Sequence, residues 1–422
     1  MSFPRYPAYK DSGAKWLGQV PAHWEIAPLK RLLDIQNGAD HKHIEQDEGY
    51  PVIGSGGSFA YASDYLYDGE SVLLGRKGTI DKPLYVIGKF WTVDTMYWTR
   101  IAPDASGRFA YYAALMIPFG YYSTNTALPS MTKGTLSAHV IACPPLDEQA
   151  AIAIFLDHET AKIDALVAEQ ERLIELLKEK RQAVISHAVT KGLDPSVPMK
   201  DSGVEWLGEV PARWEVLSIS SISTKITNGY VGPTRDILAD DGVRYLQSLH
   251  IKNNRIRFDQ PYFVREEWSL EHGKSILETG DVLIVQTGDI GQVAVVPPEF
   301  AGCNCHALII VSPIRDLLSG EWLASVLNSD YGFHSLLSIQ TGALHPHLNC
   351  GNVKFLDIPV PPRSEQDAIQ SYIAERANKF DDLIHEADIA IDMLRERRTA
   401  LISAAVTGQI DVRGLVTAQE AA

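Results

Sequence analysis

The chain has 422 residues, 45% of them apolar, which is more than one typical domain and enough to form buried cores. No apolar run approaches the ~18 residues that would span a bilayer, and the opening MSFPRYPAYK lacks the basic-then-apolar order of a secretion signal. We therefore expect a soluble, cytoplasmic protein. The net charge of −15 counts, taken alone, against nucleic acid as a partner, because phosphate contacts need clustered Lys and Arg. Local basic clusters at 76–77 and 252–257 nevertheless keep nucleic acid open as a partner.

Two pairs of segments repeat along the chain. Residues 11–25 return at 201–215 with 11 of 15 positions identical at an offset of 190. A second pair, beginning at Pro144 and Pro361, is offset by 217. These matched segments enclose two inserts, roughly 26–143 and 216–360, that hardly resemble each other. The pattern favours one duplicated frame that presents two different binding domains.

A long helix is predicted in each half. From 147 to about 188 there is no Pro or Gly and apolar residues recur at helical spacing, and the copy at the 217 offset behaves alike. Asp147 and Ser364 stand where an N-cap belongs, and Gly192 and Gly408 supply stop signals. About 41 residues at ~1.5 Å each give roughly 60 Å, long enough to hold two domains well apart. The tail after residue 411 is expected to be weakly ordered.

Heptad assignment predicts that these helices pair. Polar residues interrupt the two apolar stripes at partly equivalent places, Glu159 with Arg376 and Lys180 with Arg397, which suits an antiparallel pair related by a pseudo-twofold axis. The predicted helix-pairing residues are Ile152, Leu156, Ile163, Leu166, Leu173 and Leu177 with Ile369, Ile373, Phe380, Leu383, Leu394 and Leu401.

The inserts are rich in β-strand signals. Short apolar runs broken by Gly and Pro begin at Ser71, Pro83, Asp281, Val293 and Ala307. The predicted fold class is therefore mixed α/β. It consists of two β-rich α/β domains, two long antiparallel coiled-coil helices that join them, and an internal pseudo-twofold repeat.

One turn recurs in both inserts. Shifting SVLLGRKGTID by 210 lays it on DVLIVQTGDIG, which keeps a buried strand and a Gly turn. Arg pairs with guanine, Gln with adenine, and Asp accepts from cytosine, so exchanging such residues on a common turn would change the bases read. An ordinary solvated hairpin is the alternative. The candidate residues are Arg76, Lys77 and Thr79 in the first insert and Gln286, Thr287 and Asp289 in the second.

Further DNA-binding candidates lie in two kinds of segment. The run KNNRIR contributes Lys252, Arg255 and Arg257, which together with Arg235 and Arg244 upstream can grip phosphates or can be surface charge without a ligand. Lys133, His345 and His347 precede the long helices at similar distances, so both loops are expected to face the same partner. The two histidines can equally be turn residues.

Metal binding and catalysis are poorly supported. One insert holds several potential ligands, but CxCH is poor zinc spacing and the first insert has nothing equivalent, so no metal is expected. The potential ligands are Cys303, Cys305, His306, His345, His347 and Cys350. The four cysteines do not recur between the copies, which argues against a disulfide frame. No Walker motif, nucleophile elbow or HExxH is present, so the chain is predicted to bind and not to catalyse.

Several segments resemble a known family. WLGEVPARWE, SVLLGRKGTIDKPLYVIGKFWTVDTMYW, LETGDVLIVQTGDIG and the twice-used PPxxEQ before a long helix are similar to the specificity subunits of type I restriction-modification systems, over nearly the whole chain. The resemblance implies that the inserts are target recognition domains, each reading one half of a split, asymmetric DNA sequence. The implied segments are 1–145 and 192–362 for the recognition domains with their repeat segments, 146–191 and 363–407 for the helices, and 408–422 for the tail.

The resemblance also implies partners. The paired helices would act as a ruler between half-sites and would dock two modification subunits, which carry S-adenosylmethionine and methylate adenine. Restriction subunits would join the same assembly, and this chain would hold no cofactor itself.

Two other classes of function stay open at the level of sequence. One is a two-headed scaffold that binds proteins or glycans, and the other is a free-standing methyltransferase, which would bind S-adenosylmethionine alone. Only DNA binding predicts a steep salt dependence that flattens when Arg76 and Lys77 are neutralised.

Overall fold

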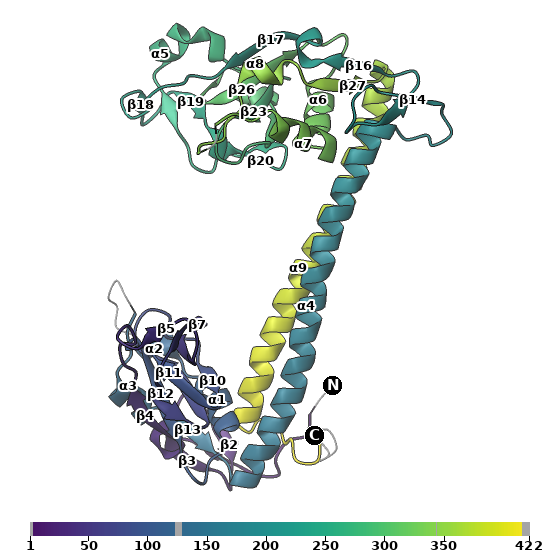
Figure 1. The fold of residues 1–422 in the computed structure, drawn as a ribbon. Helices are drawn as coiled ribbons and strands as arrows, with labels where there is room; N and C mark the ends of the chain where they lie inside the picture. Colours follow the sequence, from purple (N-terminus) through teal and green to yellow (C-terminus); the bar gives the residue numbers. More distant parts are fainter. Residues whose placement is uncertain (1–2, 123–128, 343, 416–422) are drawn as a thin grey trace. The chain divides into compact units, whose positions relative to one another are not determined.

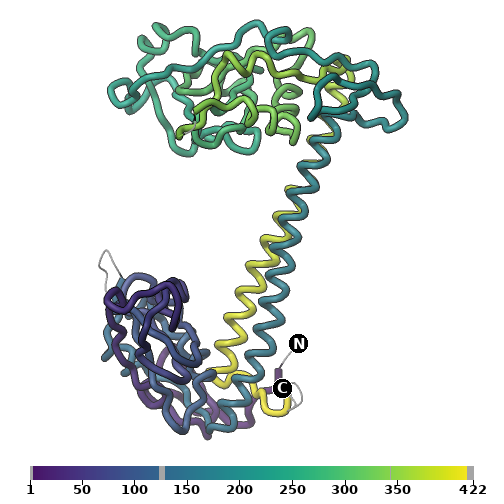
Figure 2. Tube along the Cα trace, viewed as in Figure 1, coloured from purple at the N-terminus to yellow at the C-terminus, as the bar shows by residue number. Residues whose placement is uncertain are grey.

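The computed structural model describes residues 3–122, 129–342 and 344–415, and it divides into two compact units. Unit 1 comprises Met1–Glu171 with Asp388–Ala422, and unit 2 comprises Arg172–Ala387. Figures 1 and 2 show that each unit combines one insert with segments of two long helices. The inserts are mixed α/β domains, as the sequence predicts.

The insert of unit 1 is built mainly from short strands. Its strands are β1 (Tyr9–Asp11), β2 (Gln19–Pro21), β3 (Glu25–Pro28), β4 (Leu33–Asn37), β5 (Glu45–Gln46), β6 (Tyr50–Gly54), β7 (Gly57–Ala62), β8 (Tyr67–Asp68), β9 (Ser71–Gly75), β10 (Leu84–Val86), β11 (Lys89–Thr92), β12 (Met96–Ile101) and β13 (Val140–Cys143). Its helices are η1 (Leu29–Arg31), α1 (Gly107–Leu115), α2 (Phe119–Tyr122) and α3 (Lys133–Ala138).

The insert of unit 2 has a similar composition. Its strands are β14 (Met199–Asp201), β15 (Glu209–Pro211), β16 (Glu215–Ser218), β17 (Ser223–Asn228), β18 (Leu238–Ala239), β19 (Val243–Leu246), β20 (Ile251–Lys252), β21 (Arg255–Ile256), β22 (Phe263–Val264), β23 (Val282–Val285), β24 (Val293–Val295), β25 (Asn304–Cys305), β26 (Leu308–Pro313) and β27 (Asp357–Val360). Its helices are η2 (Ile219–Ser221), η3 (Ser248–His250), α5 (Glu266–Glu271), η4 (Gly273–Ser275), η5 (Pro298–Phe300), α6 (Gly320–Leu327), α7 (Asp330–Ser338) and α8 (Cys350–Val353).

The two inserts share one topology despite their different sequences. The order β10-β9-β12-β4 in unit 1 corresponds to β24-β23-β26-β17 in unit 2, and each insert adds a second sheet that contains one parallel pair. The repeated segments form matching ribbons, β1-β2 with β13-β3 in one unit and β14-β15 with β16-β27 in the other. Fully buried central strands such as β9 and β23 explain why only the apolar strand cores remain alike.

The long helices are α4 (Leu146–Lys191) and α9 (Arg363–Val406). Each starts one residue before the expected N-cap, so Asp147 and Ser364 lie inside the first turn. In unit 1 Arg398 pairs with Asp164, and Arg395 pairs with Glu171. Moving toward the start of α9 therefore means moving toward the end of α4. The two helices therefore run antiparallel, as predicted.

The buried stripe of the helices lies one residue away from three of the twelve predicted helix-pairing positions. Leu166, Leu173 and Leu383 are wrong as helix-pairing residues, since they are 50%, 42% and 47% exposed. The stripe runs instead through Val167, Ile174 and Ile384. The other predicted residues are buried or half-buried: Ile152, Leu156, Ile163, Leu177, Ile369, Ile373, Phe380, Leu394 and Leu401.

The polar interruptions shift in the same way. Arg181 and Arg398, related by the 217 offset, are the half-buried cations of the stripe. Arg398 Nε donates to Asp164 Oδ1 at 2.8 Å in unit 1, and Arg181 Nε lies 3.4 Å from Asp381 Oδ1 in unit 2. Asp164 and Asp381 are also 217 apart, so each unit places the same ion pair in its helical stripe.

A buried glutamine joins the start of each long helix to the insert. Gln149 is 2% exposed; its Nε2 donates to Pro144 O at 2.9 Å and its Oε1 accepts from Ser106 N at 2.9 Å. Gln366 is fully buried and makes the same bonds to Pro361 O and Ser319 N, at 2.9 and 3.1 Å. Ser106 and Ser319 are the N-caps of α1 and α6. We call this arrangement the glutamine bridge.

The neighbouring glutamate contacts the repeated WLGxVPAxWE segment. Glu148 accepts from Trp24 Nε1 at 2.9 Å and from the Tyr6 hydroxyl at 3.0 Å, and His23 Nε2 lies 2.7 Å away. In unit 2 Arg213 Nε lies 3.0 Å from Glu365, while the buried Trp214 Nε1 has no hydrogen bond within the described residues. The repeated segment therefore supports the start of a long helix in both units.

The same segment also receives the end of the other long helix. Gly408 has a φ of 72°, and a Cβ there would collide with Pro21 and Trp24. Asp411 N donates to Pro4 O at 2.8 Å, and Val412 is 2% exposed. The expectation of a weakly ordered tail after residue 411 is thus wrong for Val412, which is buried, and for Arg413, whose guanidinium carbon lies 4.8 Å from the Tyr6 ring centroid. Residues 414 and 415 are exposed, and 416–422 lie outside the described part. Unit 1 uses two separate segments here, one before the repeated segment and one after α9. In unit 2 the single segment 192–199 replaces both of them, and Gly192 lies beside Trp214.

Within the described residues no helix is long and apolar enough to cross a membrane.

The helical register can be tested with neighbouring leucine and isoleucine positions. Ile174→Ala should destabilise unit 2 by about 2–4 kcal/mol because it removes a side chain that is 8% exposed, whereas Leu173→Ala should cost less than about 1 kcal/mol. Urea denaturation followed by circular dichroism measures both. Equal losses would contradict the buried stripe described above.

The stability of unit 1 should depend on pH through His139. Its ring stacks on Trp16 with centroids 5.2 Å apart, and burial lowers the pKa of His139 to about 4. Folding therefore favours the neutral ring, and this stability is present above the unfolded pKa of about 6.5 and is lost as the pH falls toward 4. Lowering the pH from 7.5 to 5 should cost about 2 kcal/mol more in wild type than in His139→Gln. Tryptophan-detected denaturation at both pH values measures this difference; an identical pH effect in the two proteins would exclude His139.

Candidate nucleic-acid interface

The turn predicted in both inserts is present in both units. β9 ends at Gly75 and β23 at Val285, and the following turns contain Gly78 and Gly288 with φ values of 81° and 82°. Only glycine adopts such angles readily, so the chain reverses at the same point in each insert. Lys77, Thr79, Thr287 and Asp289 are exposed on these turns. The shared geometry is as predicted, and contact with bases stays a prediction.

Two side chains on the turns are partly held by the protein. Arg76 donates from Nη1 to Asp94 O at 3.2 Å, and its guanidinium carbon lies 5.8 Å from the Tyr97 ring centroid. Gln286 is half-buried, and its Oε1 has no hydrogen-bond partner within the described residues. Arg76 is therefore held in place more than the lysine and threonines on these turns, whereas Gln286 is restricted by its burial alone.

A second loop lies against each turn. Met131 N donates to Arg76 O at 2.9 Å, and Leu348 N donates to Gln286 O at 3.0 Å. Lys133 follows as the first residue of α3, exposed, and His345 is exposed in the equivalent loop of unit 2. The segment just before Lys133 thus lies against Arg76 and Lys77, and residues 344–348 lead to the contact with Gln286. That both loops face one partner stays a prediction. We call each turn with its second loop a recognition edge.

His347 is a turn residue in the structure. It forms an isolated antiparallel bridge with Thr341, and its Nε2 lies 3.1 Å from Thr341 Oγ1. Its Nδ1 lies 3.2 Å from His345 O. His347 therefore shapes the loop that presents His345.

The KNNRIR run forms a hairpin, β20-β21. Asn253 and Asn254 at its tip have φ values of 51° and 57°, the left-handed angles of a tight hairpin turn. At its base His250 is buried; Gln247 N donates to Nδ1 and Nε2 donates to Gln260 O, each at 2.8 Å. Burial lowers the pKa of His250, so the ring is held neutral in this arrangement.

The basic residues of unit 2 differ in how far the protein holds them. Lys252, Arg255, Arg257, Arg235 and Arg244 are all exposed. Arg244 also donates to Glu299 O at 3.1 Å and packs over Phe300, 5.3 Å from the ring centroid. Phosphate contact by these residues stays a prediction.

The sequence did not reveal an exposed aromatic surface on unit 1. Phe59 and Tyr61 on β7 are 60% and 47% exposed, and His41 packs edge-on against Phe59 at 5.4 Å. Lys42 lies exposed beside them in sequence. Aromatic and basic side chains together are typical of nucleic-acid surfaces. Two sequence features could have indicated this surface, the HKH run at 41–43 and the alternation of aromatic residues and alanine in FAYA at 59–62. Alternation alone does not say which face of a strand is buried.

No group of three or more His, Cys, Asp or Glu within 3–122, 129–342 and 344–415 could hold a metal ion. Cys303 and Cys305 are buried, and burial raises the pKa of both thiols. These cysteines belong to the core of the insert.

Comparison with known proteins supplies the family. The model of the type I restriction modification DNA specificity domain matches residues 21–176 and 211–391, which is most of the chain. The chain is 22% identical to the specificity subunit of the type I restriction enzyme EcoBI from Escherichia coli, over 92% of this chain and 86% of that one. It is 23% identical to the putative MjaX specificity subunit of Methanocaldococcus jannaschii, over 96% and 98%.

Solved structures agree on the fold. A chain from a study of the assembly and conformational transition of the type I restriction-modification system superposes with a TM-score of 0.69 at 15% identity, covering 92% of this chain and 98% of that one. The HsdS subunit of Thermoanaerobacter tengcongensis gives 0.50 at 14% identity, over 93% and 98%. These matches give no support to a scaffold for proteins or glycans. The chain belongs to the type I restriction-modification DNA specificity family.

Proposed function

We propose that this chain is the non-catalytic, DNA-reading subunit of a type I restriction-modification complex, with each recognition edge reading one half of a bipartite, asymmetric site. The observation that carries the proposal is that one turn-and-loop geometry is built twice with different side chains on it. Two different edges on equivalent scaffolds account for an asymmetric site better than two identical ones would.

The chemistry of the edges supports direct reading of bases. Arg76 and Lys77 are donors suited to the N7 and O6 acceptors of guanine. Gln286 carries the amide type that pairs with adenine, and its Oε1, buried without a partner among the described residues, would have to turn outward to do so. Asp289 accepts from the amino group of cytosine. Lys133, Arg235, Lys252, Arg255, Arg257 and His345 supply positive charge or donors toward phosphates.

Neutralising one edge tests this function. In the complex with its modification subunits, Arg76→Ala with Lys77→Ala should lower the slope of log affinity against log salt by about 2 and relax one half of the methylated motif. The other half should stay unchanged, because it is read by unit 2. Fluorescence anisotropy and methylome sequencing supply the two readouts.

Lys162→Ala is the matched control, since Lys162 is an exposed cation on α4 that pairs with Glu159 at 2.9 Å. It should change neither the motif nor the slope. An unaltered motif and slope in the Arg76, Lys77 variant would remove this edge from DNA recognition.

The outer faces of the long helices support docking of two modification subunits. In unit 1 Leu166 on α4 and Met393 on α9 are 50% and 65% exposed; in unit 2 their counterparts at the 217 offset, Leu383 and Leu176, are 47% and 52% exposed. Exposed apolar side chains on an otherwise charged helix mark a protein contact. Because the same surface occurs once in each unit, it fits two copies of one partner.

Charged residues on these surfaces should change the stoichiometry of the complex. Leu166→Glu with Met393→Glu should leave one modification subunit bound in place of two, and adding Leu176→Glu with Leu383→Glu should leave none. Native mass spectrometry counts the subunits, with circular dichroism as the check that the helices remain folded. Retention of both subunits by the fourfold variant would place docking elsewhere.

The remaining assignments follow from this role. S-adenosylmethionine would be held by the modification subunits, which transfer the methyl group to adenine, and this chain would position them on the duplex. Restriction subunits would join the same assembly, and the complex would act in the cytoplasm, where the DNA of the cell lies.

A further inference from the structure

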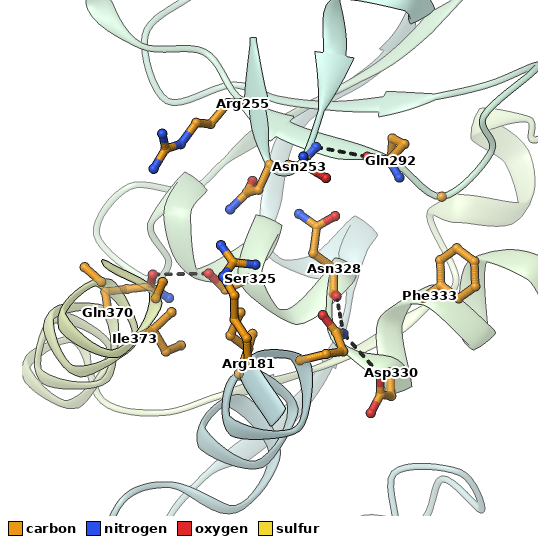
Figure 3. Close-up of a pocket in the computed structure, with 16 residues that line it drawn as sticks. Arg181, Asn253, Arg255, Gln292, Ser325, Asn328, Asp330, Phe333, Gln370 and Ile373 are labelled. Atoms are coloured by element: carbon orange, nitrogen blue, oxygen red, sulfur yellow. Dashed lines mark hydrogen bonds between the residues drawn. The ribbon is translucent and has the colours of Figure 1, made fainter. Parts of the chain in front are cut away.

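A polar cavity of about 480 Å³ lies within unit 2, and Arg255 is the one DNA-binding candidate named above that lines it. Its walls come from the tip of the β20-β21 hairpin, the loop before β24, the α6-α7 corner and both long helices (Figure 3). The residues used below are Arg181, Asn253, Arg255, Gln292, Asp330 and Gln370.

Several hydrogen-bond donors in this cavity lack an acceptor. Gln370 Oε1 accepts from the Ser325 hydroxyl at 3.1 Å, which leaves Gln370 Nε2 buried without a partner within the described residues. Arg181 Nε is likewise buried without a hydrogen bond, although Asp381 Oδ1 lies 3.4 Å away. Buried donors of this kind cost free energy unless a ligand or water accepts from them.

The cavity also holds a cation without a counter-ion. Arg255 makes neither an ion pair nor a side-chain hydrogen bond within the part of the chain that the structure describes. Figure 3 shows Arg255, Asn253, Arg181 and Gln370 around one end of the cavity, with the acidic Asp330 at the other. Asp330 Oδ1 already accepts from Gln182 Nε2 at 3.1 Å. Asp381 pairs with Arg181, so Arg255 supplies the unpaired positive charge of the donor-rich end, which attracts an anion with several acceptor atoms.

A phosphate group fits these donors best. Two arginines and two amides approach from different segments, which suits a tetrahedral group with several acceptor oxygens better than a planar carboxylate. The volume exceeds that of a free phosphate ion, so the group would belong to a larger molecule. Gln292 lies in the same loop as the recognition turn, six residues after Gln286, which places the cavity next to one recognition edge.

We propose that this cavity binds one phosphate group through Arg255, Gln370 and Arg181. The phosphate can come from two sources. One is a backbone phosphate of the duplex at the recognition edge of unit 2, and in that case the proposal rests on the proposed function. The other is a free nucleotide.

Unit 1 offers no counterpart. Arg398, the equivalent of Arg181, has its Nε bonded to Asp164, and the position equivalent to Gln370 is Ala153. The two-stranded sheets among the described residues of unit 1 are β1-β2 and β13-β3, which belong to the repeated segments and have their own counterparts in unit 2, so neither corresponds to β20-β21. The phosphate contact would therefore belong to one half of the DNA site only.

Methylphosphonate scanning of the duplex tests the proposal in the complex with modification subunits. In wild type, neutralising one phosphate beside the half-site of unit 2 should weaken binding about tenfold. Arg255→Ala and Gln370→Ala should each weaken binding to normal DNA and abolish the response to that single substitution. Arg255→Ala should also lower the salt slope by about 1, whereas Gln370→Ala should leave the slope unchanged because it removes no charge.

Arg376→Ala is the matched control, because Arg376 is an exposed cation on α9, the helix that carries Gln370, and does not line the cavity. It should keep the methylphosphonate response. Thermal denaturation of each variant separates a lost contact from a lost fold.

A second arm measures ATP and pyrophosphate binding to the complex without DNA by calorimetry. If no methylphosphonate position depends on Arg255, but nucleotide binding is lost in both variants, the phosphate comes from a free nucleotide. If neither dependence is found, the proposal is wrong. An unchanged bipartite methylation motif in that last case would show that the proposed function stands without it.

Discussion

The glutamine bridge is the interaction on which the rest of each unit depends. One buried amide donates to the carbonyl before the long helix and accepts from the backbone of the serine that caps α1 in unit 1 and α6 in unit 2. Truncating it would leave a buried carbonyl and a buried N–H unsatisfied at once, each costing about 1–3 kcal/mol. The insert is thus fixed to the start of its helix, and the recognition edge takes its orientation from a residue far from DNA.

The repeat explains which residues are free to vary. Trp24 and Trp214, Gln149 and Gln366, and the glycines that end the long helices all lie in packed contacts between segments. The strands of the two inserts have equivalent topology, yet their loops differ in length and charge because only the apolar strand cores are needed for the sheets. Differences on the turns, Arg76 against Gln286, therefore alter what is bound without altering how the unit folds.

Sequence patterns predicted much of this architecture, and their errors have physical causes. The long helices and the Gly turns follow from local chemistry, namely the lack of Pro and Gly in one case and the need for positive φ in the other. The helical register was off by one position because Leu166 and Leu173 lie beside Val167 and Ile174, so that two adjacent stripes are both apolar. One stripe faces the partner helix and the other lies outward, a choice that only the packed pair decides. The cavity with Arg181, Arg255 and Gln370 could not be predicted, because its walls come from segments up to 196 residues apart in sequence.

The discontinuity of unit 1 bears on how the chain is made. Unit 2 is a single stretch, whereas unit 1 needs the end of α9 and the 408–413 segment to cover Pro21, Trp24 and Phe155. During vectorial synthesis on the ribosome, unit 2 can close as soon as its own residues emerge. Unit 1 must wait for residues more than 380 positions downstream of its first strand, with an apolar groove open in the meantime. The second half to be translated is therefore expected to be the first to acquire its native core.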